Sequence, residues 1–83
     1  MVVERQSGTS VRRGTIRWFD ARRGFGFIIP NEGGPDVFLY RTVLRAAGLK
    51  RLDPGQRVEY EVEETPRGRK ATAVKLVPSL PDP

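Results

Sequence analysis

The side chains in this sequence that could do chemistry are carboxylates, aromatic rings and arginines. The 83 residues include no Cys and no His. Thiolate nucleophiles, imidazole bases and zinc sites built on Cys or His are therefore excluded, and with them the Ser-His-Asp, Cys-His and common zinc-hydrolase mechanisms. Catalysis by carboxylates alone remains, but it needs a pocket that positions them.

Four of the ten carboxylates lie close together in one short run: Glu59, Glu61, Glu63 and Glu64. Three of them alternate with Val58, Tyr60 and Val62, which is the period-two pattern of a half-buried strand. The alternation places these glutamates on one solvated face, with no base or metal ligand nearby. We therefore predict that the protein is not an enzyme and has no catalytic residue, no metal site and no cofactor.

Aromatic residues alternate with small or aliphatic residues along two other short runs. The rings of the first run are Phe25 and Phe27, and those of the second are Phe38 and Tyr40. Successive side chains of a strand point to opposite faces, and the aliphatic residues of both runs already supply an apolar face for the core. The four rings therefore point away from that core. Large exposed apolar patches on small domains usually mark binding sites.

The same alternation allows another interpretation, in which the rings form the core of a sandwich. Two observations count against it. The chain is too short for two full layers, and the opposite faces would then expose Ile28, Val37 and Leu39. We therefore expect the rings on the surface. Trp18 and Phe19 lie one on each face of the preceding strand if it is regular, and a bulge or a strong twist would bring both to the surface.

Arginines surround the expected aromatic surface. The chain carries 15 Lys+Arg against 10 Asp+Glu, a net charge of +5. The first two strands and their hairpin, within residues 11–29, contain Arg12, Arg13, Arg17, Arg22 and Arg23. Such a surface suits single-stranded nucleic acid, because bases stack on rings for about 1–3 kcal/mol each while guanidinium groups contact phosphates. The combination favours a nucleic-acid-binding surface, and the alternative is a protein-interaction module that uses the same aromatic patch.

Turn residues divide the chain into segments of strand length. Clusters of Gly, Pro, Asn and Asp separate five runs, at residues 14–20, 24–29, 36–40, 56–63 and 69–76. Five short strands with no long helix between them predict an all-β domain, either a small antiparallel barrel or a sandwich. The one helical candidate is residues 42–48, with Thr42 as N-cap and Gly48 just after the last turn.

A chain of this length has room for one domain, which we place at residues 11–77. Residues 1–10 lack periodicity and residues 78–83 are rich in proline, so we predict flexible segments at both ends. No apolar run approaches the roughly 20 residues of a membrane span, and residues 1–8 lack the pattern of a secretion signal. We expect a cytoplasmic protein without membrane contacts.

Several segments resemble one known family, the bacterial cold-shock domains. Residues 14–28 read G-T-I-R-W-F-D-A-R-R-G-F-G-F-I, where the family typically has G-T-V-K-W-F-N-x-x-K-G-F-G-F-I. Residues 23–28 and 36–40 look like the two RNA-binding motifs of the family. Residues 52–62 are similar to its fourth-strand pattern L-x-x-G-Q-x-V-x-F-x-V. The resemblance therefore covers nearly the whole of the expected domain.

This resemblance implies a five-stranded antiparallel OB-type β-barrel that binds single-stranded RNA or DNA with little sequence preference. Family members act as nucleic-acid chaperones and affect transcription and translation. By matched position, the implied nucleic-acid-binding residues are Arg17, Trp18, Phe19, Arg23, Phe25, Phe27, Phe38, Tyr40 and Arg41. The tryptophan and phenylalanines would stack on bases, and the first two arginines replace the usual lysines. We expect the protein to act as a monomer.

Four positions depart from the family pattern. Tyr40 stands in place of His, Arg41 in place of Phe and Asp20 in place of Asn, and Leu49 lies where the long loop often presents another aromatic residue. Tyr40 can still stack but has no charge at low pH, and Arg41 is a poorer apolar platform. Asp20 places an acidic group next to the expected phosphate path. We predict binding that relies less on stacking and more on charge, which puts the strand-melting activity of the family in question.

Overall fold

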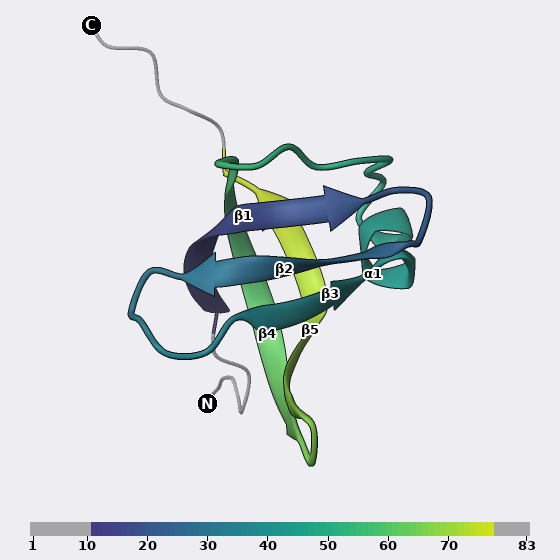
Figure 1. The fold of residues 1–83 in the computed structure, drawn as a ribbon. Helices are drawn as coiled ribbons and strands as arrows, with labels where there is room; N and C mark the ends of the chain where they lie inside the picture. The colour runs from purple at the N-terminus through teal and green to yellow at the C-terminus, as the bar shows by residue number, and fades with distance from the viewer. Residues whose placement is uncertain (1–10, 78–83) are drawn as a thin grey trace, which may run out of the picture.

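The chain folds into a closed barrel of five strands in the order β1-β2-β3-β5-β4 (Figure 1). The computed structural model describes residues 11–77. Its elements are β1 (Val11–Asp20), β2 (Phe25–Pro30), β3 (Val37–Tyr40), α1 (Arg41–Ala46), β4 (Arg57–Thr65) and β5 (Gly68–Leu76). The predicted five-stranded barrel is confirmed, and the sandwich is wrong because the sheet closes on itself. The flexible segments predicted for residues 1–10 and 78–83 lie outside the described residues.

Strand directions agree with the expected antiparallel barrel at every contact between neighbouring strands but one. Four of the five neighbouring pairs are antiparallel, but β3 and β5 run parallel and share one register pair, Phe38 with Lys70. The difference has a geometric reason. A closed ring with an odd number of strands cannot alternate in direction all the way round, so one contact has to be parallel. In Figure 1, β1, β2 and β3 form the near wall of the barrel and β4 and β5 the far wall.

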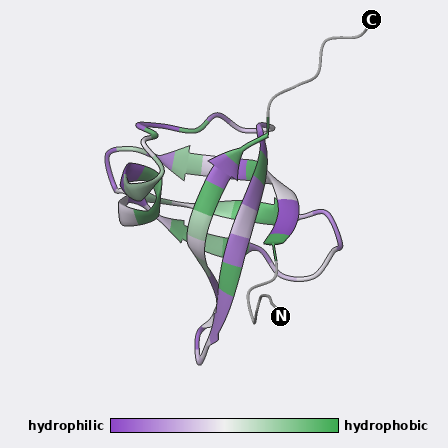
Figure 2. Cartoon of the chain, turned by 180° about the vertical axis from the view of Figure 1, so that it is seen from behind, coloured by the Kyte–Doolittle hydropathy of each residue, from purple (hydrophilic) through white to green (hydrophobic). Residues whose placement is uncertain are grey.

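Alternating side chains from all five strands fill the barrel. Ile28, Val37 and Leu39 are fully buried, as predicted from the alternation in β2 and β3. The bands of apolar and polar residues along β4 and β5 show the same alternation on the far wall (Figure 2). The rest of the core consists of Ile16, Val43, Leu44, Leu52, Val58, Tyr60, Ala71 and Val74. The core therefore excludes the aromatic residues of β2 and β3.

A bulge interrupts β1 where it passes β2. Ile16 pairs with Ile28, but the next register pair is Trp18 with Phe27, so Arg17 is the extra residue. Ile16 is buried, whereas Arg17 and Trp18 are both exposed. Phe19 then turns back and packs against the core. The bulge that we considered therefore exists, but it brings Trp18 to the surface and not Phe19.

The helix α1 follows β3 without an intervening loop. Its N-cap is Tyr40, without a side-chain cap, so the prediction of Thr42 as N-cap is wrong. The backbone N–H of Arg41 instead donates to the carbonyl of Gly24, at 2.8 Å. The C-terminal end agrees with the prediction, because Gly48 adopts a φ of 77° and its N–H donates to the carbonyl of Arg45. Among residues 11–77, no helix is long and apolar enough to cross a membrane.

Candidate nucleic-acid interface

Five aromatic rings lie together on the outer surface of β1, β2 and β3. We call this cluster the aromatic face, and its members are Trp18, Phe25, Phe27, Phe38 and Tyr40. Trp18 is 37% and Tyr40 38% exposed, and the phenylalanines are half-buried between them. The interpretation in which these rings form the core of a sandwich is therefore wrong.

Strand register explains why the rings meet although they come from three strands. Trp18 pairs with Phe27, Phe27 with Phe38, and Phe25 with Tyr40. Directly opposed residues of antiparallel strands present their side chains on the same face within contact distance. The tryptophan reaches this row because the bulge at Arg17 shifts the register of β1. Local alternation and one bulge thus assemble the aromatic face.

The rings support one another in two arrangements. Phe25, Phe38 and Tyr40 form a stacked series, with ring centroids 5.8 and 6.2 Å apart and interplanar angles of 28° and 24°. Trp18 packs edge-on against Phe25 and Phe27, at 5.5 and 5.4 Å. Such contacts add about 0.5–1.5 kcal/mol per pair beyond the area that they bury. The face is therefore formed before a ligand arrives, which lowers the entropy lost on binding.

Arg17 lies beside Trp18 and is held by a carboxylate. Its Nε atom is 2.6 Å from Oδ2 of Asp36, the residue just before β3. The Arg17 side chain keeps half of its surface exposed. An arginine so placed can also contact a phosphate, because a guanidinium has five N–H donors and Asp36 engages only part of them.

Arg23 lies at the end of the β1–β2 hairpin, where Asp20 organises the turn. One carboxylate oxygen of Asp20 accepts hydrogen bonds from the backbone N–H groups of Arg22 and Arg23, at 2.9 and 3.1 Å. The other lies 3.7 Å from Arg23 Nε. Asp20 therefore fixes the hairpin and draws Arg23 toward it, a structural role that sequence analysis did not assign.

Phe19 and Arg41 lie apart from the aromatic face. Both line a hollow at α1, together with Leu44 and Leu49. Phe19 packs against the core through its partly buried ring. Of the nine predicted binding residues, the structure thus brings together Arg17, Trp18, Phe25, Phe27, Phe38 and Tyr40, with Arg23 at the hairpin and Phe19 and Arg41 in the neighbouring hollow.

The glycines between the rings have a structural reason. A methyl group on Gly26 would overlap the carbonyl oxygen of Trp18 and lie 2.7 Å from the Cα atom of Phe19. One on Gly24, whose φ is 82°, would lie 2.8 Å from Cδ of Arg41. Gly26 therefore allows β1 to approach β2, and the positive φ of Gly24 is one that glycine adopts without strain.

Sequence analysis missed one cation next to the aromatic face. Lys70 of β5 is exposed and pairs in register with Phe38 across the parallel contact. No local signal could have identified it, because Lys70 and Phe38 belong to strands that are not consecutive and that become neighbours only when the barrel closes.

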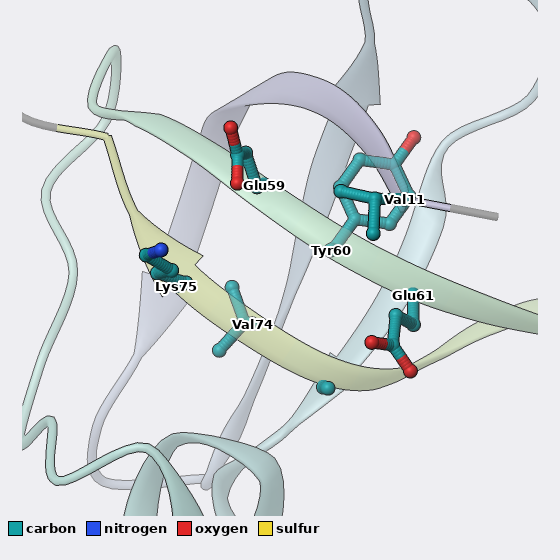
Figure 3. A pocket seen from close by; sticks show the side chains of 7 residues that line it. Val11, Glu59, Tyr60, Glu61, Val74 and Lys75 are labelled. Atoms are coloured by element: carbon teal, nitrogen blue, oxygen red, sulfur yellow. The ribbon is translucent and has the colours of Figure 1, made fainter. Parts of the chain in front are cut away.

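The glutamates of β4 lie on the far wall of the barrel. Glu59 and Glu61 line a shallow pocket with Val11 and Lys75 (Figure 3). Glu59 is paired with Arg13 at 3.2 Å. Within residues 11–77, no three side chains of His, Cys, Asp or Glu are grouped so that they could hold a metal ion. The two carboxylates make this pocket an unfavourable place for a polyanion.

Comparisons with known proteins agree with this geometry. Residues 12–77 match the family model of the 'Cold-shock' DNA-binding domain. The chain is 43% identical over 65 residues to "Probable cold shock protein A" of Mycolicibacterium smegmatis, which covers 78% of this chain and 97% of that protein. It is 45% identical to "Cold shock-like protein" of Thermotoga maritima, with the same coverage of both chains. The match to "Protein lin-28 homolog" of Drosophila melanogaster is 41% over 64 residues, a third (33%) of that protein.

The matched residues include β2 to β5 and all of β1 but its first residue, and with them the aromatic face, the bulge and the hairpin. Proteins with cold-shock domains bind single-stranded nucleic acids. From its barrel, its aromatic cluster and these relatives, this chain belongs to the cold-shock domain family, a family of nucleic-acid-binding proteins.

Proposed function

We propose that this protein binds single-stranded RNA or DNA on its aromatic face and performs no catalysis. Bases stack on Trp18, Phe25, Phe27 and Phe38, with Tyr40 as an additional platform, while Arg17 and Arg23 contact phosphates. The observation that carries the proposal is the outward cluster of five rings on a barrel whose core is complete without them. Rings and cations on one surface are what sequence-tolerant binding of single strands requires.

The cellular role that follows is that of an RNA chaperone or a regulator of transcription or translation. The binding domain spans residues 11–77, and the protein binds as a monomer. It acts in the cytoplasm, where single-stranded RNA is made and used. Arg41 and Phe19 contact the ligand only where it extends past the aromatic face toward α1, since they line the neighbouring hollow. Arg41 stands where the family usually has a phenylalanine, and it offers no aromatic ring for a base to stack on. We therefore expect this protein to melt structured RNA less well than a relative that has the phenylalanine.

Fluorescence of Trp18, the one tryptophan in the chain, tests the proposal directly. A pyrimidine-rich DNA oligonucleotide added at low salt should quench it, because a base stacks on or near the indole. The same sequence as a duplex should bind more weakly, since its bases are not available for stacking. The absence of quenching, or equal affinity for the duplex, would contradict the proposal.

Removal of two rings separates binding from folding. The double variant Phe25→Ala/Phe27→Ala should weaken binding by about 2–6 kcal/mol if two bases stack there, while circular dichroism still shows the folded barrel. Phe19→Ala is the control, because Phe19 packs against the core. It should lower the free energy of unfolding by about 1–3 kcal/mol, less than for a fully buried Phe, with a smaller effect on binding. Unchanged affinity of the double variant would exclude stacking on these rings.

Salt separates this function from docking of a partner protein on the same patch. Phosphate contacts release counterions, so the affinity for a single strand should fall steeply as salt is raised. Docking of a partner through apolar contacts would change little over the same range.

A further inference from the structure

Lys70 continues a row of side chains that crosses four strands. The register pairs Trp18–Phe27, Phe27–Phe38 and Phe38–Lys70 are consecutive, from β1 through β2 and β3 to β5. Neighbouring strands lie about 4.8 Å apart, so the row is about 14 Å long. Three rings of the aromatic face form the row, and Lys70 lies at its β5 end.

The side chain of Lys70 points to the same side of the sheet as the rings. Val37 and Leu39, on either side of Phe38, are fully buried, and so is Ala71, which follows Lys70. Alternation therefore places Phe38 and Lys70 outward on adjacent strands. Lys70 is exposed there, next to the ring that stacks with both Phe25 and Tyr40.

Three of the other cations on these strands and hairpins are engaged by carboxylates. Asp36 holds Arg17, Asp20 lies by Arg23, and Arg69 is bound by Glu64 at 3.0 Å and lies 3.7 Å from Glu32. Lys70 takes part in no ion pair among residues 11–77. Its register partner on β4 is Glu63, which is also exposed and forms no ion pair within the same part of the chain.

We infer that Lys70 binds a phosphate of the single strand at the β5 end of the aromatic face. This inference rests on the proposed function and adds a direction to it. A segment whose bases cover Trp18, Phe27 and Phe38 has its backbone held by Lys70 at the β5 end of the row, while Arg17, which is bound to Asp36, contacts the backbone along the row. The ligand therefore runs across the strands from β1 to β5.

The test compares Lys70→Ala with Lys75→Ala. Both variants remove one lysine from β5 and lower the net charge equally, but Lys75 lies in register with Glu59 on the far wall. Each phosphate contact with a single strand contributes about 0.7 to the slope of log affinity against log salt. Lys70→Ala should therefore reduce the slope by about 0.7 and the affinity about fivefold at 0.1 M salt. Lys75→Ala should change neither, and Lys70→Arg should restore both.

Glu63 needs its own control, because without the positive charge of Lys70 the neighbouring carboxylate could itself repel the phosphates of the ligand. In a Glu63→Gln background, Lys70→Ala should still reduce the slope by the same amount. Disappearance of the effect in that background, or an equal effect of Lys75→Ala, would overturn the inference while quenching of Trp18 still supports the proposed function. Failure of the wild-type protein to bind single strands would overturn both. Thermal unfolding of each variant checks that the barrel is intact.

Discussion

At the scale of single residues, Tyr60 places a polar hydroxyl group in the core of the barrel. It is 2% exposed, and its hydroxyl has no hydrogen-bond partner among the described residues. Burial raises the pKa of the phenol above its ordinary value, and the charge of Glu32 adds to that rise, while Arg12 and Arg69 oppose it. Burying a hydroxyl without a hydrogen-bond partner costs free energy, and a phenylalanine would fill the same space without that cost.

We therefore expect Tyr60→Phe to leave stability at neutral pH unchanged or to raise it by about 1 kcal/mol, because an unpaired buried hydroxyl costs about 1–3 kcal/mol. The pKa of Tyr60 is higher in the folded state than in the unfolded chain. Below the unfolded pKa near 10, the phenol is protonated in both states and its titration does not affect the free energy of unfolding. As the pH rises from there through the raised folded pKa, the unfolded chain loses its proton first, so the free energy of unfolding falls. Urea unfolding at several pH values should show this alkaline loss in the wild type and not in the variant. A variant clearly less stable than the wild type at pH 7 would show that the hydroxyl has a partner.

At the scale of elements, the contact between β1 and β2 decides the shape of the aromatic face. The bulge at Arg17 places Trp18 outward, and the strands then approach so closely at Gly26 that no side chain fits. Asp20 closes the hairpin that joins the two strands. The position of Trp18 therefore depends on one extra residue in β1 and one missing Cβ atom in β2.

Gly26→Ala tests this dependence. Its methyl group would meet backbone atoms of β1, so we expect a loss of stability of about 1–3 kcal/mol and a changed emission spectrum of Trp18. Gly48→Ala is the comparison, because that glycine has open space around it but a positive φ of 77°. It should cost about 1–2 kcal/mol through backbone strain and leave the emission of Trp18 unchanged. A Gly26→Ala variant with wild-type stability and spectrum would show that the strands can separate there without effect.

At the scale of the whole molecule, ion pairs reinforce the place where the barrel closes. β3 and β5 share a single register pair. Near this contact, Glu32 of the β2–β3 loop binds Arg12 of β1 and lies 3.7 Å from Arg69 of β5. One carboxylate thus connects three parts of the chain that are distant in sequence.

Glu32→Gln should lower the free energy of unfolding by about 1 kcal/mol, since it weakens two partly exposed ion pairs that each contribute up to about 1 kcal/mol. The difference from the wild type should shrink at high salt, because salt screens such pairs. Glu64→Gln breaks only the pair with Arg69 inside the β4–β5 hairpin, so its effect should be smaller. Thermal unfolding at low and high salt provides the measurement, and equal effects of the two variants would show that Glu32 does not connect the barrel.

The sequence alone predicted most of the fold and much of the candidate site. Alternation in β2 and β3 correctly separated core residues such as Ile28 and Leu39 from the rings, because period two follows from strand geometry. The prediction of Thr42 as N-cap failed for a tertiary reason, because α1 continues directly from β3. The close packing of β1 against β2 at Gly26 is likewise a tertiary feature that no local pattern shows.

What the sequence determined by itself is local: the strand runs, the side of each strand that is buried, and a basic aromatic segment that resembles a known family. The tertiary structure decided which distant residues meet. A closed ring of five strands must contain one parallel contact, and no local pattern says which strands make it. In this protein β3 and β5 make the parallel contact. For this reason Lys70 lies beside Phe38 at the β5 end of the aromatic face.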